Sequence, residues 1–349
     1  MRASAMDWFE QLTGFAESTG AVGYEATRQR LELDGRHLRS RANGRQFSIG
    51  SLELVSLQSL RERALSRPPV AGQRSFRVVH GNVRGLHAQP EYTGALFQAA
   101  SQFNLLEMVG PEVTPEHGVT RYASDPTQGP ACAIAAGAAT LYRNYFAPVG
   151  GAVGQTRDRQ LDGFADLGTA VAHGLGRTAD KLWTMRNGYA MFTSNGIDLM
   201  SGHVQALDEG RRDALRQRLQ IGVHWDVEVT HGTAAPGPLV SQAFCSALPV
   251  AYNDLGGARG ANWAPLAVLV LEAAYEATLW SSVINAQRGA SRKVLLTSVG
   301  GGAFGNDERW IRAAMHRAVQ AVQGHGLEIL LVSFRAPSAE LQGWVQALA

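Results

Sequence analysis

Residues 294–311, reading VLLTSVGGGAFGNDERWI, constrain the fold of this chain more than any other segment. An apolar run ends in Thr-Ser, three consecutive glycines follow, and a helical pattern starts near Trp310. Glycine lets the backbone adopt positive φ and brings N–H groups close to a ligand, and the positive end of a helix favours anions. We therefore predict a strand, an anion-binding loop and a helix, with Phe304 as a flat wall beside a sugar or a base. The alternative is a tight turn with a packing Phe.

Composition and charge narrow the class of protein. The chain has 349 residues, of which 45% are hydrophobic and 18% charged, as in a globular protein with a large core. The net charge of +2 gives no reason to expect nucleic acid as a partner. Cys132 and Cys245 stand in small or apolar surroundings and indicate buried thiols in a reducing compartment. No Cys/His cluster suggests a metal, and we expect neither a metal nor a cofactor.

The sequence also gives expectations for the cellular location and the domain organisation of the chain. We see no apolar segment typical of a secretion signal and no membrane-spanning run, so we expect a cytoplasmic protein, with export as an effector left open. The oligomeric state stays unknown. Residues 1–70 are predicted to form an N-terminal extension packed on the core, and residues 71–349 a catalytic domain with an insertion at about 147–225. Strands that alternate with helices indicate a layered α/β fold.

A second loop complements the triple glycine. The sequence DPTQGP at 125–130 opens an alanine-rich helix predicted over 131–145. In an open α/β sheet, ligands bind where strands end and loops gather. Two loops that each open a helix could hold the two phosphates of a diphosphate.

Four segments in this order resemble the macrodomain superfamily, which binds ADP-ribose. They are VVHGNV at 78–83, GALFQAASQFN at 94–104, DPTQGPA at 125–131 and SVGGGAFGN at 298–306. The resemblance implies a macrodomain-like three-layer α/β/α fold with a mixed sheet. It departs from the family in two places: Asn82 replaces the usual Asp beside adenine, and the first loop has one glycine instead of several.

The resemblance also implies a set of site residues. Asn82 would contact adenine, Asn104 would position the distal ribose, and Phe304 would lie against that ribose. The residues expected to bind ADP-ribose are Asn82, Gln98, Thr127, Gln128, Gly129, Gly300, Gly301, Gly302, Ala303, Phe304, Gly305 and Asn306.

A narrower likeness is to the MavL-like branch of bacterial effectors, which removes ADP-ribose from arginine, including on ubiquitin. The phrases SQFNLLEM, TQGPACA, LPVAY and LEAAYEATL carry it. It implies a hydrolase that removes mono-ADP-ribose from protein side chains, with ADP-ribose and an ADP-ribosylated protein as partners. The polar, glycine-rich loop of the insertion would then select the modified protein and take no part in the pocket.

Carboxylates distinguish a catalyst from a non-catalytic ADP-ribose reader, which is the alternative function. Cleavage of an N-glycosidic bond builds positive charge at the ribose C1, and carboxylates can stabilise it or activate water. The candidates are Asp125, Asp254 and Glu272. Glu272 stands in an apolar helical stretch, where a charged side chain needs an ion-pair partner or a catalytic role. The structural alternative is a helix cap or turn carboxylate for Asp125, a turn residue for Asp254 and a salt bridge to arginine for Glu272. Glu107 is expected to be structural. An NAD-dependent oxidoreductase fits less well, because the glycine loop lies near the C-terminus.

Overall fold

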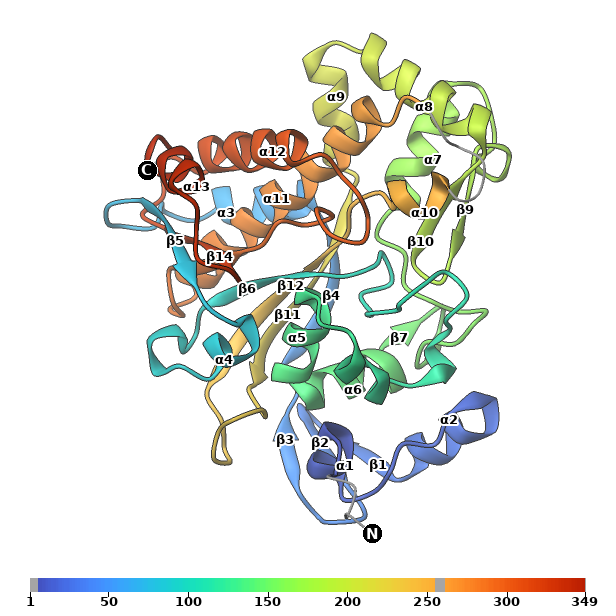
Figure 1. Cartoon of the computed structure of the whole chain (residues 1–349), viewed down its shortest axis with the longest axis vertical. Helices are drawn as coiled ribbons and strands as arrows, with labels where there is room; N and C mark the ends of the chain where they lie inside the picture. The colour runs from blue at the N-terminus through green and yellow to red at the C-terminus, as the bar shows by residue number, and fades with distance from the viewer. Residues whose placement is uncertain (1–5, 255–260, 349) are drawn as a thin grey trace.

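The computed structural model describes residues 6–254 and 261–348 of the chain (Figure 1). Within these residues the centre is a seven-stranded sheet in the order β4-β11-β12-β6-β13-β14-β5. Its strands are β4 (Ser51–Ser56), β5 (Ser75–His80), β6 (Leu96–Ala100), β11 (Gln220–Glu228), β12 (Leu239–Cys245), β13 (Lys293–Leu296) and β14 (Glu328–Ser333).

The sheet is mixed. The five strands β12, β6, β13, β14 and β5 run parallel to one another, whereas β11 pairs antiparallel with both β12 and β4. Parallel strands bring their carboxyl ends to one edge of the sheet, where an open α/β fold places its ligand.

Helices cover both faces of this sheet. One face carries α3 (Leu57–Leu65), α11 (Ala264–Gln287) and α12 (Glu308–Ala321), and the other carries α4 (Val83–His87), α5 (Gln128–Ala135) and α6 (Gly137–Tyr145). Along β13, Val294 and Leu296 pack in the first apolar cluster and Leu295 in the second, as the two-residue period of a strand requires. The predicted three-layer α/β/α arrangement with a mixed sheet is confirmed.

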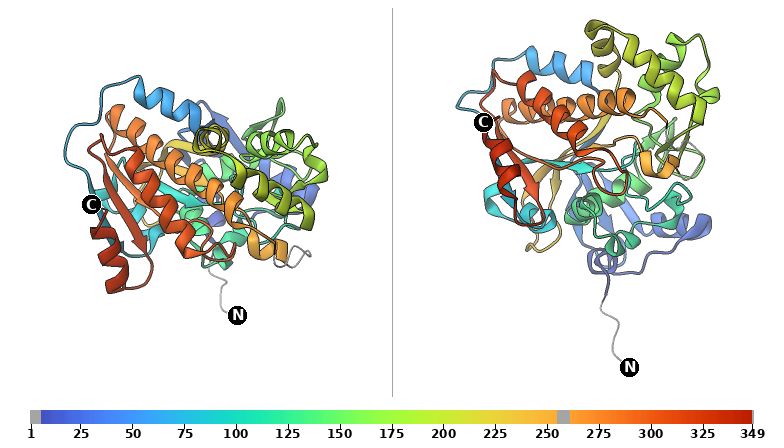
Figure 2. Two further views of the ribbon diagram at one scale, coloured as in Figure 1. Left: turned by 90° about the horizontal axis from the view of Figure 1, so that it is seen from above. Right: turned by 45° about the horizontal axis from the view of Figure 1, so that its top comes forward.

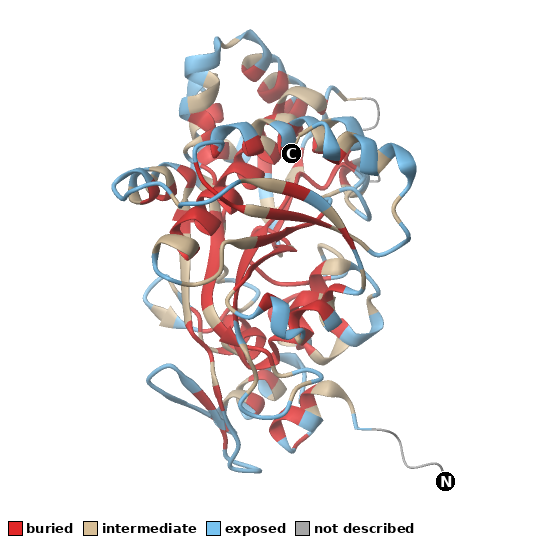
Figure 3. Cartoon of the chain, turned by 90° about the vertical axis from the view of Figure 1, so that its left-hand side faces the viewer, coloured by how far each residue is buried: buried red, intermediate tan, exposed pale blue. Residues whose placement is uncertain are grey.

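Helix α11 is the central helix of the first layer. Its 24 residues are long and apolar enough to cross a membrane by length and composition alone, yet 89% of its most apolar window is buried inside the protein. It packs beside α12 and α3 (Figure 2), and the buried residues run through the sheet and the facing sides of the helices (Figure 3). Burial on all sides accounts for a helix that is apolar all round.

The N-terminal region forms a small layer of its own. It contains α1 (Trp8–Thr13), α2 (Gly20–Gln29) and an antiparallel sheet of β1 (Leu31–Asp34), β2 (His37–Ser40) and β3 (Gln46–Ser48). Its apolar side chains share a cluster with Ile134 and Leu141 of the helices α5 and α6. The structure differs from the expected division at residue 70, because β4 pairs with β11 and α3 packs on α11, so both belong to the central layers.

The inserted region follows α6 and returns to the sheet at Gln220, earlier than the expected end near 225. Its elements are β7 (Pro148–Val149), β8 (Ala152–Val153), α7 (Ala165–Gly174), β9 (Trp183–Arg186), β10 (Tyr189–Phe192), α8 (Ser194–Ala206) and α9 (Glu209–Arg216). The chain also contains α10 (Val250–Asp254) and α13 (Ala339–Gln346).

The alanine-rich segment 131–145 is two helices where one was predicted. Helices α5 and α6 meet at Ala136, which has a non-helical ψ of 63°. The amide of Gly137 donates to the Thr230 hydroxyl at 2.9 Å, and this bond replaces a helical one. A side chain on Gly137 would also come within 3.0 Å of the Trp8 ring.

Candidate active site

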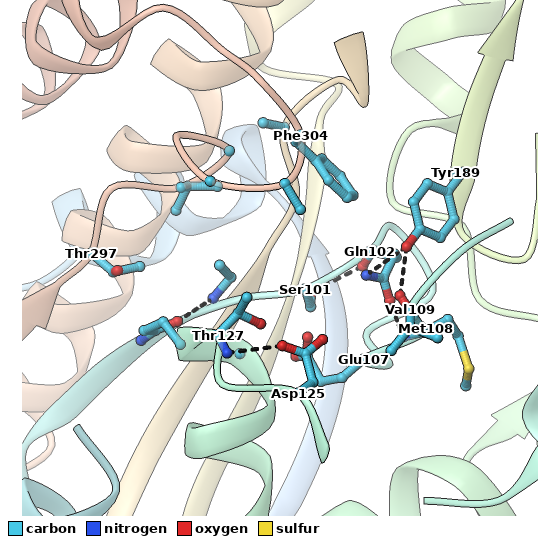
Figure 4. A pocket seen from close by; sticks show the side chains of 18 of the residues that line it. Ser101, Gln102, Glu107, Met108, Val109, Asp125, Thr127, Tyr189, Thr297 and Phe304 are labelled. Atoms are coloured by element: carbon cyan, nitrogen blue, oxygen red, sulfur yellow. Dashed lines mark hydrogen bonds between the residues drawn. The ribbon is translucent and has the colours of Figure 1, made fainter. Parts of the chain in front are cut away.

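A cavity of about 320 Å³ opens at the carboxyl ends of β6 and β13 (Figure 4). Segments far apart in the sequence meet there because parallel strands end at one edge. Its lining consists of Ala100, Ser101, Gln102, Glu107, Met108, Val109, Asp125, Thr127, Gln128, Gly129, Tyr189, Ala247, Tyr252, Thr297, Ser298, Val299, Gly300, Gly302, Ala303 and Phe304.

The start of α5 forms one side of the cavity. Thr127 is the N-cap residue of this helix, and its side chain makes no capping hydrogen bond. The Gln128 side chain accepts from the Ala100 amide at 2.9 Å and donates to the Gln98 carbonyl at 2.8 Å, which fixes the helix start to β6. A Cβ on Gly129 would lie 1.9 Å from the Ala100 carbonyl oxygen, so only glycine fits there. The first amides of a helix are well suited to a phosphate.

The glycine loop forms the opposite side. Gly300 has φ +77°, and a Cβ there would lie 2.5 Å from the Ala247 Cβ, so this position requires glycine. The buried Asn306 holds the loop by donating to the Leu248 carbonyl at 2.9 Å. Gly301, Gly305 and Asn306 shape the loop but do not line the cavity, unlike their predicted partners Gly300, Gly302, Ala303 and Phe304.

The order of strand, loop and helix at 294–311 is confirmed, with one correction. Helix α12 starts at Glu308, and its N-cap residue Asp307 accepts a hydrogen bond from the Arg309 amide. An acidic side chain therefore already occupies the positive end of this helix. On this side the glycine loop lines the cavity, and the N-terminal end of α12 does not. The predicted binding of an anion at a helix N-terminus therefore applies to α5 alone.

Glu107 lies on the cavity wall although we expected it to be structural. Its side chain is buried, and its Oε1 atom has no hydrogen-bond partner among the described residues. Burial raises the pKa of Glu107 well above its ordinary value; the Arg143 charge opposes the shift and the Asp125 charge adds to it. A raised pKa on a carboxyl group in a cavity is typical of a general acid.

Asp125 is the second carboxylate of the cavity. It is half-buried, and its Oδ1 atom accepts a hydrogen bond from the Thr127 amide at 2.8 Å. The turn contact that was the structural alternative is therefore present in a residue that also lines the cavity. Figure 4 shows Asp125 and Glu107 on the same side of the cavity, from two different loops.

The loop that bears Glu107 is held by several hydrogen bonds. Gln102 accepts from the Met108 amide at 2.6 Å, and the Tyr189 hydroxyl donates to the Met108 carbonyl at 2.5 Å. Leu105 adopts a positive φ of 65°, and its carbonyl accepts from the buried Arg143 guanidinium at 3.2 Å. A residue other than glycine keeps a positive φ only where the surrounding structure holds it in place. The Glu107 carboxyl group is thus placed by a constrained backbone.

Three aromatic rings form the remaining wall. Phe304 lies 5.3 Å from Tyr189 and 5.7 Å from Tyr252, measured between ring centroids. Tyr189 comes from β10, so the inserted region builds part of this wall. This corrects the expectation that the insertion takes no part in the pocket.

Two residues predicted for the ligand lie behind the cavity. Asn104 is completely buried, donates to Gln160 and accepts from the Leu106 amide, so it shapes the loop and does not reach the ribose space. Gln98 is buried within the sheet, where it donates to the Thr278 hydroxyl and accepts from the Thr297 amide. Neither side chain lines the cavity, because a polar residue inside the protein has to satisfy its own hydrogen bonds first.

Of the other predicted residues, Glu272 and Asn82 also lie outside it. Glu272 pairs with the buried Arg216 at 3.3 Å, in a separate hollow beside α9, which is the salt-bridge alternative, and it does not line the cavity. Asp254 ends α10, and its side chain lies outside the described residues. Asn82 caps α4 by accepting from the Arg84 amide at 3.0 Å, at the carboxyl end of β5 and not in the cavity.

Sequence reasoning missed Gln102, Tyr189 and Tyr252 as cavity residues. Gln102 stands within the segment SQFN, but we assigned the ribose-positioning role in this segment to Asn104. Tyr189 and Tyr252 have no local signal, because they reach the cavity only through the packing of β10 and α10 against the glycine loop. Among the described residues, no three His, Cys, Asp or Glu side chains are grouped to hold a metal ion. Cys132 and Cys245 are buried free thiols, as predicted.

No protein-family model and no curated protein matches this chain. Among solved structures, it is similar to poly(ADP-ribose) glycohydrolase from Deinococcus radiodurans in complex with ADP-ribose, with a TM-score of 0.44 and 13% identity over 85% of this chain and 93% of that chain. It is also similar to poly(ADP-ribose) glycohydrolase from Thermomonospora curvata, with a TM-score of 0.42 and 12% identity over 93% and 96%. The latter enzyme bound to the inhibitor ADP-HPD gives a TM-score of 0.41 and 13% identity over 93% and 94%. These similarities concern the overall fold, and the chemistry of the site follows from the cavity's own geometry.

Proposed function

We propose that this chain is an ADP-ribosyl hydrolase that removes mono-ADP-ribose from a protein side chain. The observation that carries the proposal is the pair of carboxylates, Glu107 and Asp125, in a cavity between two amide-rich loops. The diphosphate would lie between residues 127–129 and 300–303, and the distal ribose against Phe304. Backbone amides and a helix N-terminus bind phosphate without needing a cationic side chain.

The reaction consumes one water molecule. The bond between ribose C1 and the side-chain nitrogen breaks, and a bond between C1 and the water oxygen forms. Glu107, whose pKa is raised by burial, donates its proton to the leaving nitrogen. Asp125 accepts a proton from the attacking water, and both carboxyl groups face the positive charge that develops at C1.

The adenine end of the ligand extends beyond the cavity along the same sheet edge. Phe334 follows β14 and is 74% exposed, which is unusual for so large an apolar side chain. It lies next to Gly81, whose amide donates to the Ser333 carbonyl at 3.0 Å. We place adenine against the Phe334 ring, with the Asn82 amide nitrogen as a donor to the base.

We further propose arginine as the modified residue, including arginine on ubiquitin, and the cytoplasm as the place of action. The Asp125 carboxylate beside the leaving group suits a cationic guanidinium. The SQFNLLEM and TQGPACA segments contain most of the cavity side chains on this wall, and they are the segments that resemble the arginine-specific branch.

Release of ADP-ribose tests the proposal. The protein is incubated with arginine-ADP-ribosylated and aspartate-ADP-ribosylated proteins, and free ADP-ribose is measured by chromatography. Release from the arginine substrate supports the proposed function in full. Release from the aspartate substrate alone removes the arginine assignment. Binding of ADP-ribose without release from either substrate identifies a reader module instead.

A further inference from the structure

A groove adjoins the cavity on the far side of Asp125. It has a volume of about 470 Å³ and shares Asp125 and Val109 with the cavity. Its other lining residues are His117, from the short 3₁₀ turn Pro115–His117, Arg121 and Ser124, from the turn Thr120–Ser124, and Pro126. Because Asp125 lines both, a polypeptide bonded to a ribose in the cavity would have this groove beside it.

Arg121 is the unusual residue of this groove. Its side chain forms no hydrogen bond or ion pair with any described residue, and its Nε atom is shielded from solvent. A shielded donor without an acceptor destabilises a protein, so such a group points to a missing partner. An anion in the groove supplies that partner, and a guanidinium can bind a carboxylate through two parallel hydrogen bonds.

His117 adds a second donor. Its Nδ1 atom accepts from the Thr114 amide at 3.1 Å, so the proton of the neutral ring is on Nε2. The groove therefore offers a guanidinium, an imidazole N–H and the Ser124 hydroxyl, and its only acid is Asp125, which the proposed reaction uses.

From this arrangement we propose that the groove binds acidic residues that flank the modified residue of the substrate polypeptide. The inference rests on the proposed function and names the kind of substrate. The apolar rim, with Val109 at 41% exposure and Pro126, suits a peptide. A second ADP-ribose unit fits less well, because the lining of the groove offers no Phe, Tyr or Trp against which another adenine could stack.

Two peptides that carry one ADP-ribosylated arginine test the inference. One has Asp and Glu on both sides of the modified arginine, and the other has Asn and Gln. We expect kcat/KM to be about tenfold higher for the acidic peptide, the size of one hydrogen bond between charged groups, and the difference to shrink as salt is added. Arg121→Gln should abolish the difference while leaving the neutral peptide unchanged, and Arg121→Lys should keep part of it. Arg36→Gln removes an exposed charge from the N-terminal sheet and should change neither rate.

The possible results separate the inference from the proposed function. Equal rates on both peptides, with ADP-ribose released, overturn the inference and keep the hydrolase. A loss in Arg121→Gln that affects only poly(ADP-ribose) also overturns it and assigns the groove to a second diphosphate. If no substrate is hydrolysed, the hydrolase fails, and calorimetry with the same peptides decides the groove: tighter binding of the acidic peptide by the native chain than by Arg121→Gln supports the inference, and equal binding overturns it.

Discussion

Glu107 has the environment that a proton donor needs, because burial and the nearby Asp125 both hold its proton in place. Glu107→Gln should lower kcat by about 10²–10⁴, the usual range for losing a general acid, while ADP-ribose still binds. Glu272→Gln is the matched control, because Glu272 pairs with Arg216 outside the cavity and should leave kcat unchanged. Steady-state kinetics and calorimetry on both variants check this prediction. A large loss in Glu272→Gln with full activity in Glu107→Gln would reverse the two assignments.

The raised pKa of Glu107 also predicts a pH dependence. The reaction needs the protonated form, so kcat should fall as pH rises through this raised pKa. The Asp125 charge contributes to the shift, so Asp125→Asn, though slower, should move this decline to lower pH. A decline at the same pH in both proteins would show that another group titrates.

Because the pKa of Glu107 is raised in the folded state, ionisation of Glu107 destabilises the fold, and Glu107→Gln should raise Tm more at mildly alkaline than at mildly acidic pH.

At the scale of elements, the glycine loop between β13 and α12 offers a matched pair of substitutions. Gly300 has positive φ and no room for a Cβ, whereas a Cβ on Gly302 meets no atom within 4 Å. Gly300→Ala should therefore lower both Tm and ADP-ribose affinity. Gly302→Ala should leave Tm unchanged and weaken ADP-ribose binding alone, because the methyl group enters the ligand space. Thermal unfolding and calorimetry distinguish the two, and unaltered affinity in Gly302→Ala would place the diphosphate elsewhere.

The same element shows how much the sequence could predict. The strand, the loop and the helix at 294–311 follow from an apolar run, glycines and helical spacing, which are local signals. The cavity assignment of Tyr189 could not follow, because β10 reaches the glycine loop only through tertiary packing. Glu272 shows the same limit. Its apolar neighbours indicated a catalytic role, because only the fold brings its ion-pair partner, Arg216 of α9, close to it. Asn104 and Gln98 were chosen by residue type and order, but the structure buries Asn104 in the loop after β6 and Gln98 within the sheet, and neither lines the cavity.

At the scale of the whole molecule, a buried ion cluster ties four helices together behind the sheet. Glu276 of α11 accepts from Arg61 of α3 at 2.6 Å, from Trp280 at 3.0 Å and from Arg317 of α12, and Arg61 also pairs with Asp213 of α9. Burial alone would raise the pKa of Glu276, but these hydrogen bonds outweigh it and the net shift is downward.

Loss of this carboxylate should be costly. Glu276→Ala removes the buried acceptor that Arg61 and Arg317 share, but both arginines keep Asp213 as a partner. The loss should therefore lie near the lower end of the about 3–5 kcal/mol that breaking a buried pair typically costs. Urea unfolding measures the free energy directly. The folded variant should bind ADP-ribose with unchanged affinity, because no residue of the cluster lines the cavity. A loss of affinity without a loss of stability would mean that the cluster communicates with the site.

An experimental structure of the chain with ADP-ribose tests the central claim most directly. We predict the diphosphate between the start of α5 and the triple-glycine loop, the distal ribose against Phe304, and its C1 atom within reach of Glu107 and, through one water, of Asp125. A diphosphate bound away from both loops, or a ribose whose C1 points away from the two carboxyl groups, would contradict the account.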